Sequence, residues 1–155
     1  MSLGIRASIL KIIDMIENVV PKTDVHQNFV CVKNLSGSNF GLEASGLGER
    51  YFDFVFTSLP EDDGFSGISL RKRVDLQLRI KYQLTSPVEA AFKELQIAED
   101  ASSLVNALLG PDYDSASTGV VSIVVGQPFV DTPVQEQTLY TLLILPFTLH
   151  FYEEM

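Results

Sequence analysis

Polar and apolar residues alternate without exception along Arg73-Val-Asp-Leu-Gln-Leu-Arg-Ile-Lys-Tyr-Gln-Leu84. Only a period of two puts all the apolar side chains of such a run on one side, so the pattern predicts a β-strand with one dry face and one face turned to solvent or to a partner. At roughly 3.3 Å per residue the strand would span about 40 Å, about twice the usual length. A strand this long in a chain of 155 residues indicates a platform rather than a pocket.

The composition is that of one ordinary globular domain covering residues 1–155, with 46% hydrophobic and 20% charged residues. A net charge of −9 argues against a specific nucleic-acid partner, because phosphate contacts need clustered lysine and arginine. The single cysteine, Cys31, permits no internal disulfide and fits a reducing compartment. The longest apolar run, Leu139–Leu149, is too short to cross a bilayer, so we expect a soluble protein with no membrane partner.

Two segments have the spacing of amphipathic helices. The first covers Leu3–Val20 and ends at Pro21. The second starts at Ser86-Pro-Val-Glu89, a capping box with proline at the first helical position, and runs to Leu109, with a break allowed near 96–100. The expected buried stripe of this second helix is Val88, Ala91, Phe92, Leu95, Ala98, Ala101, Val105, Leu108 and Leu109.

Further strands are predicted over Val25–Lys33, Arg50–Thr57, Val120–Val125 and Thr138–Tyr152. The nearly all-apolar Val120–Val125 is expected at the centre of the sheet. Pro146 cannot donate to a ladder, which places that part of the last strand at an edge or a bulge. Together these elements predict an α+β fold, a mostly antiparallel sheet of four or five strands with two helices packed on one face.

No catalytic or metal-binding motif is present. His26 and His150 have no ligand-type neighbours at metal spacing, and Glu61-Asp-Asp-Gly64 lacks the alternating ligands of a calcium loop. The glycines form no phosphate-binding loop, and nothing pairs a serine or cysteine nucleophile with a histidine. We therefore expect no catalytic residue, no metal and no cofactor, and a protein that is not an enzyme.

The basic residues cluster on one loop and strand: Arg71, Lys72, Arg73, Arg79 and Lys81. Two interpretations stay open. The cluster is either a solvated strand face or a basic patch that meets the acidic surface of a neighbouring copy. On the second interpretation Arg71, Arg73, Arg79 and Lys81 are subunit-interface residues.

The segment Asn34–Glu49 has loop composition, with four glycines and three serines. A loop of this length is uncommon in a compact domain unless it is functional or mobile. Phe40 and Leu42 give it apolar anchors. It is predicted either as an assembly loop that orders against a partner, with these two side chains at the subunit interface, or as a passive mobile excursion.

The order of elements resembles the tail terminator, or tail-completion, proteins of long-tailed bacteriophages, a family of neck proteins. The resemblance rests on patterns in five segments rather than on a motif. These are the apolar stripe of Ile5–Val20, Arg50-Tyr-Phe-Asp-Phe-Val-Phe56, Arg73–Tyr82, the helical region Ser86–Leu109 and a last strand ending in Leu149-His-Phe-Tyr152.

The resemblance implies a small structural subunit without catalytic residues that forms a homo-oligomeric ring, a hexamer in that family. Such a ring caps the tail tube and joins it to the head. Its implied partners are other copies of the chain, tail-tube proteins and head-connector proteins, and its implied location is the virion tail, after assembly in the bacterial cytoplasm. An alternative from another class is a small soluble ligand- or lipid-binding domain that uses the aromatic interior of Phe52, Phe54, Phe56 and Tyr82.

Overall fold

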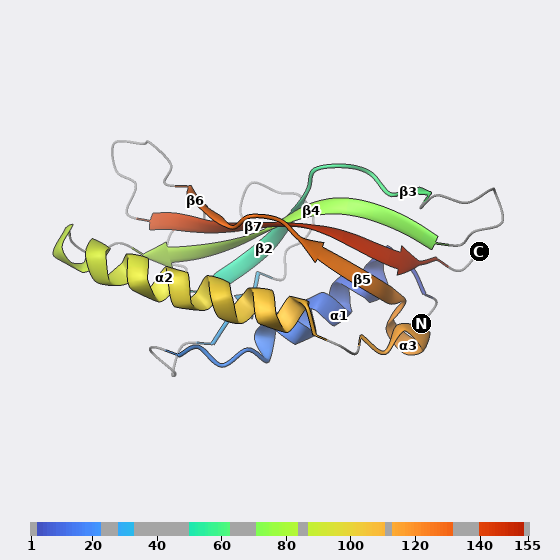
Figure 1. Ribbon diagram of the computed structural model, residues 1–155, viewed down its shortest axis with the longest axis horizontal. Coiled ribbons are helices and arrows are strands. Elements are labelled where there is room, and N and C mark those ends of the chain that lie inside the picture. The colour runs from blue at the N-terminus through green and yellow to red at the C-terminus, as the bar shows by residue number, and fades with distance from the viewer. Residues whose placement is uncertain are drawn as a thin grey trace.

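The computed structural model describes residues 3–22, 28–32, 50–62, 71–83, 87–110, 113–131 and 140–153. Within these ranges the chain folds into an α+β domain with a mixed seven-stranded sheet and three helices (Figure 1). In chain order the elements are α1 (Ile5–Glu17), β1 (Val30–Cys31), β2 (Tyr51–Phe56), β3 (Glu61–Asp62), β4 (Arg71–Gln83), α2 (Pro87–Leu108), α3 (Ser115–Thr118), β5 (Val120–Val125), β6 (Phe129–Asp131) and β7 (Tyr140–Tyr152).

Two long antiparallel strands form the frame of the sheet. β4 and β7 have 13 residues each and pair along their whole length, from Arg71 opposite Tyr152 to Gln83 opposite Tyr140. The alternation seen in the sequence of β4 appears as an inner row of fully buried side chains, Val74, Leu76, Leu78, Ile80 and Tyr82. The prediction of a long strand with one dry face is therefore confirmed.

The sheet order is β1-β2-β4-β7-β5, with β3 added to β4 and β6 added to β7. All pairs are antiparallel except β1 with β2. This agrees with the predicted α+β class and the mostly antiparallel sheet. The described residues contain more than the four or five strands expected, because β1, β3 and β6 have only two or three residues each and leave no periodic pattern in a sequence.

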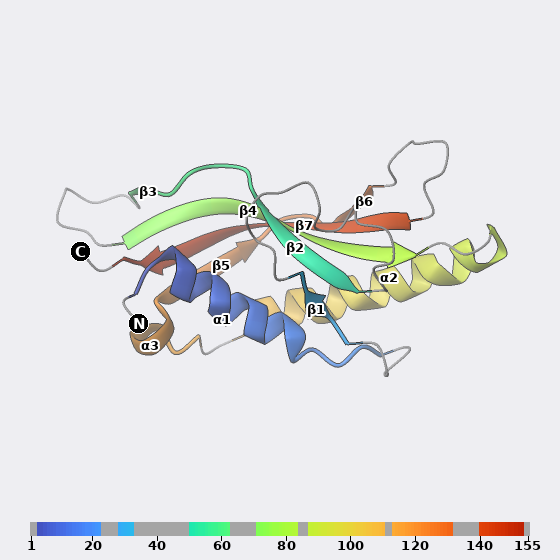
Figure 2. The same ribbon diagram turned by 180° about the vertical axis from the view of Figure 1, so that it is seen from behind.

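Helices α1 and α2 cover the same face of the sheet, as both views show (Figures 1 and 2). They bury Ile12, Ile16, Leu104 and Leu108 against the inner rows of the strands. The two expected helices thus lie where they were predicted, and the four-residue α3 is an addition. We call the sheet face that α1 and α2 cover the inner face, and the opposite one the outer face.

The predicted stripe of α2 was right in part: Leu108 is buried, and Ala101 and Val105 pack against the core. The side chains of Val88, Ala91 and Phe92 lie outside the described residues. Helix α2 continues without a break through 96–100 and buries Ile97 and Asp100, whereas Leu95 is 62% exposed and Leu109 is also exposed. Asp100 lies one turn from Ile97 and one turn from Leu104, so the buried face includes a charged position. A buried stripe assigned from apolar residues alone therefore omits Asp100.

β5 lies at the edge of the sheet rather than at its centre, and among the described strands it pairs with β7 alone. Pro146 is in an interior strand, at the gap between the ends of β5 and β6. Its carbonyl accepts a hydrogen bond from the Gly126 N–H at 2.7 Å, on the side away from β4. In a β-strand the N–H and C=O groups of one residue point to the same side. The proline nitrogen, which has no hydrogen to donate, therefore also faces this gap, and no hydrogen bond to β4 is lost.

Candidate interaction surface

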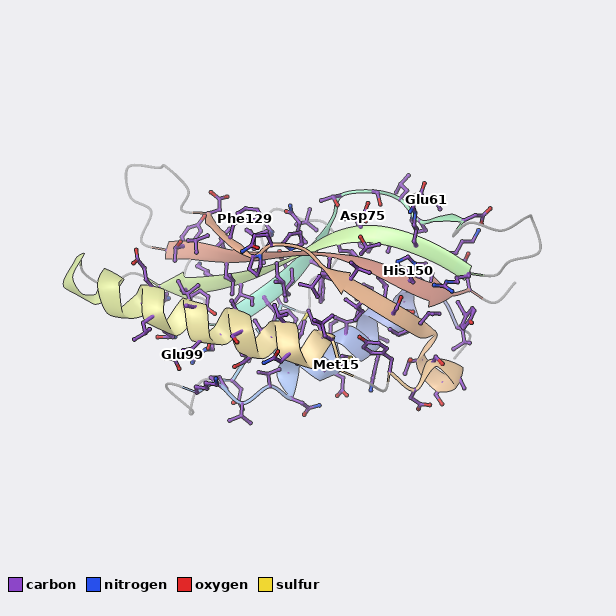
Figure 3. The ribbon with its side chains drawn as sticks, in the orientation of Figure 1. Met15, Glu61, Asp75, Glu99, Phe129 and His150 are labelled. Atoms are coloured by element: carbon purple, nitrogen blue, oxygen red, sulfur yellow. The ribbon has the colours of Figure 1, made fainter. Side chains whose placement is uncertain are left out.

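The outer face of the sheet carries the polar row of β4. Figure 3 shows Asp75 and Glu61 on one side of the sheet and Met15 and Glu99 on the other side, where the helices lie. The register places Asp53 of β2 beside Arg79, and Glu61 of β3 beside Arg73. Every second residue of β4 is turned to this face, which places Arg71, Arg73, Arg79 and Lys81 of the basic cluster on it, whereas Lys72 is turned to the other side.

The basic side chains of this face have acidic partners within the same chain. Arg79 binds Asp53 through two hydrogen bonds, from Nε to Oδ1 at 2.9 Å and from Nη2 to Oδ2 at 2.6 Å. Arg73 Nε donates to Glu61 Oε1 at 2.7 Å. Lys72, which the alternation turns to the opposite side of β4, pairs with Asp62. The hydrogen bond with Asp62 raises the pKa of Lys72 above its ordinary value. The face is therefore a ladder of ion pairs between strands.

Lys81 is not solvated, contrary to the first of the two interpretations of the basic cluster. Only 5% of its surface is exposed, and its Nζ lies 4.7 Å from the centre of the Tyr140 ring. Nearby, Leu142 and Ile144 form a second apolar cluster with Val32 and Tyr51. On the outer face this apolar cluster thus lies beside the charged positions Arg79 and Lys81, and the ammonium group of Lys81 is stabilised by an aromatic ring.

A shallow hollow of about 300 Å³ crosses the outer face between β2 and β5. Thr57, Gln77, Val124 and Pro146 are among the residues that line it. On its floor the Thr148 hydroxyl donates to Asp75 Oδ1 at 2.6 Å. The hollow is open to solvent and its one carboxylate is already hydrogen-bonded, so it has neither the enclosure nor the convergent polar groups of a small-molecule site.

Of the predicted interface residues, the structure brings Arg71, Arg73, Arg79 and Lys81 onto one strand, with Arg71 opposite Tyr152 at its start. Phe40 and Leu42, with the rest of the segment 34–49, lie outside the described residues. Whether Arg73 and Arg79 also meet a neighbouring copy stays a prediction. Any such contact would compete with the Glu61 and Asp53 partners that these guanidinium groups already have.

Beneath the sheet lies a buried charged group that the sequence patterns did not reveal. Arg50 Nε binds Asp100 Oδ2 at 2.8 Å, and the Tyr82 hydroxyl donates to the same oxygen at 2.7 Å. All three side chains are fully buried, and the guanidinium group also lies over the Phe29 ring. A buried carboxylate needs a counter-charge or hydrogen-bond donors, so the helical spacing of Asp100 from Leu104 was the one sign of this group in the sequence.

The described residues also bear on metal binding and on membrane insertion. In those ranges no three His, Cys, Asp or Glu side chains gather as metal ligands would, and no helix is long and apolar enough to span a membrane. No protein-family model matches the chain, and no curated protein matches it either. What the geometry offers is surface: a charged sheet face and the edges of the sheet.

Proposed function

We propose that this chain is a structural subunit that assembles with other copies of itself into a ring, in the manner of the tail terminator proteins of long-tailed bacteriophages. The observation that carries the proposal is the sheet itself. β4 and β7 form a fully paired platform of 13 residues in each strand. The described strands beside it are short, and no other described strand pairs with the backbone beyond their ends. An open edge is a template for another strand, and ring assembly protects such edges by pairing them between copies.

Exposed apolar side chains near the edges support the same proposal. Phe56 of β2, Val124 of β5 and Phe129 of β6 are each about half exposed. Isolated surface apolar residues are common, but here they belong to strands at opposite sides of one sheet. A subunit with two apolar edges can join a neighbour on either side, which is what a ring requires.

The resemblance adds the biological setting to this proposal. In that setting the partners are other copies of the chain, the tail tube and head-connector proteins, the location is the virion tail, and assembly takes place in the bacterial cytoplasm. The role needs no catalytic residue, no cofactor and no bound nucleic acid.

The ligand-binding alternative has less support from the described residues. Its aromatic interior is packed: Phe54 makes edge-to-face contacts with Phe52 and Phe147, at centroid distances of 5.9 and 6.1 Å. Tyr82 is fully buried and hydrogen-bonded to Asp100. The phenyl rings thus fill the space that a ligand would need.

The proposal is tested by the mass and shape of the purified full chain over a range of concentrations. We expect sedimentation velocity to show a discrete species several times the 17.2 kDa of one chain, and electron microscopy to show closed rings with a central opening. A monomer at every concentration, a compact dimer or an open filament would contradict the ring.

A further inference from the structure

Among the described residues, no strand pairs with the outer side of the edge strand β5, and the strand lacks the charged residues and proline that usually protect an edge. Its sequence, Val120-Val-Ser-Ile-Val-Val125, holds no charged residue and no proline, and one bulge near its start is its only irregularity. Natural edge strands are usually protected by lysine, proline or a covering element. An uncharged segment of six residues rich in β-branched side chains is also the type most prone to adding strands. Val124 in this edge is 58% exposed.

At the opposite edge of the sheet, the described residues cover one end. There β1 pairs with Tyr51 and Phe52, and the outward N–H of Cys31 donates to the Glu17 carboxylate of α1 at 3.3 Å, which terminates the sheet at that point. Beyond Phe52, no described strand lies beside Asp53–Phe56 on the side away from β4. Phe56 in this segment is 49% exposed.

We propose that β5 of one copy pairs with the outer edge of β2 of the next copy, so that the sheets of neighbouring subunits join head to tail. This inference rests on the proposed ring and names the surface that forms it. Both strands have six residues. The inner row of β2, with Phe54 and Phe56, would continue the inner row of β5, with Ile123 and Val125, and β5 brings no charge to oppose Asp53.

The pairing is head to tail because the two edges lie at opposite sides of the sheet. The same contact can then be repeated from copy to copy until the ring closes. If β5 paired with β5 of a second copy across a two-fold axis, the assembly would stop at a dimer and leave both β2 edges unpaired.

The first experiment places a charge in the edge. Val124→Lys should raise the concentration at which the full chain assembles by about tenfold or more, because a lysine on an edge strand opposes strand addition. Leu95→Lys is the matched control, since Leu95 is exposed to a similar degree but lies on α2. Circular dichroism must show that both variants are folded. If Val124→Lys assembles like the parent chain, the β5 edge is not the contact.

The second experiment identifies the strand that pairs with β5. Val55→Cys and Val124→Cys are made separately in a Cys31→Ser background, both on the outer side of the sheet, and treated with a short bismaleimide cross-linker. We expect cross-linked dimers in the mixture of the two variants and none in either variant alone. Dimers of Val124→Cys alone would overturn the head-to-tail arrangement in favour of a two-fold one. A mixture that assembles but does not cross-link would overturn it as well.

The two proposals fail differently. If the parent chain stays monomeric, the ring itself is wrong. If the parent forms rings and neither edge variant affects them, the ring stands and only the edge assignment falls.

Discussion

Arg50, Asp100 and Tyr82 show how much of this fold depends on three side chains far apart in sequence. They join the start of β2, the end of β4 and the middle of α2. Arg50 also adopts a φ of 61°, in the left-handed region, which costs a non-glycine residue about 1 kcal/mol or more. A strained backbone at a buried arginine indicates that the guanidinium position is fixed by the ion pair rather than by local preference.

Asp100→Asn should therefore destabilise the protein strongly. It leaves Arg50 buried without a counter-charge, which typically costs about 3–5 kcal/mol in the free energy of unfolding. The double variant Arg50→Met with Asp100→Leu should recover most of that loss, because well-packed apolar residues often replace a buried ion pair at little cost. Urea denaturation of the three proteins measures both effects, and equal loss in the single and double variants would contradict this role of the ion pair.

A second residue-scale prediction concerns pH. Tyr113 donates a hydrogen bond to the Leu108 carbonyl, and burial raises the pKa of its phenol above 10.0. Because the folded-state pKa is the higher one, the unfolded chain loses this proton first, so the stability from neutral Tyr113 is complete below about pH 10 and declines as the pH rises through the folded-state pKa.

Tyr113→Phe should cost about 1 kcal/mol at neutral pH through the lost hydrogen bond. The difference in unfolding free energy between parent and variant should then shrink above pH 10. A difference that stays constant from pH 7 to pH 11 would show that this phenol does not titrate with folding.

At the scale of elements, the spacing of apolar residues predicted the helices and strands that have one buried face. β4, β7 and the amphipathic α1 were found from their apolar spacing, because each has one face in a continuous core. Part of the α2 stripe was missed because Asp100 stands in it where an apolar residue was expected. The edge position of β5 was missed because an apolar strand has the same sequence pattern at an edge as in the centre of a sheet. The burial of Lys81 depends on Tyr140, a residue of another strand. The local sequence pattern around Lys81 gives no sign of this contact.

The two faces of β4 give a direct test of the strand assignment. Leu78→Asp should prevent stable folding, because the carboxylate would lie in the core without a partner. Gln77→Asp, one residue away on the outer face, should change the free energy of unfolding by no more than about 1 kcal/mol. Thermal melting of both variants checks this, and similar melting temperatures would be inconsistent with the assignment.

The outer-face ion pairs lead to a further prediction for β4. Arg79→Glu with Lys81→Glu should destabilise the subunit itself, because the first new carboxylate would face Asp53 and the second would lie in the nearly buried Lys81 position. From the sequence alone the same double substitution is expected to leave the fold intact. Adding Asp53→Arg should restore part of the stability. If the double variant melts like the parent, these pairs contribute little to folding.

At the scale of the whole molecule, net charge separates the two possible interfaces. Each copy carries a formal charge of −9, so a ring brings acidic subunits together. If the contact is the uncharged β5 edge, raising the salt concentration screens this repulsion and should lower the concentration needed for assembly. If the basic residues of β4 meet acidic groups of a neighbour, added salt should raise it. Sedimentation from low to high salt decides between them.

The pairing of β4 with β7 has a consequence for how the chain reaches this structure. Partners in that ladder are from 57 positions apart, between Gln83 and Tyr140, to 81 apart, between Arg71 and Tyr152. Loops this long must close before the ladder gives any stabilisation, and such high contact order slows folding to about milliseconds or longer. On the ribosome the edge of β4 that pairs with β7 must therefore stay unpaired until β7 has emerged, which makes the nascent chain, rather than the finished subunit, the form most in need of a chaperone.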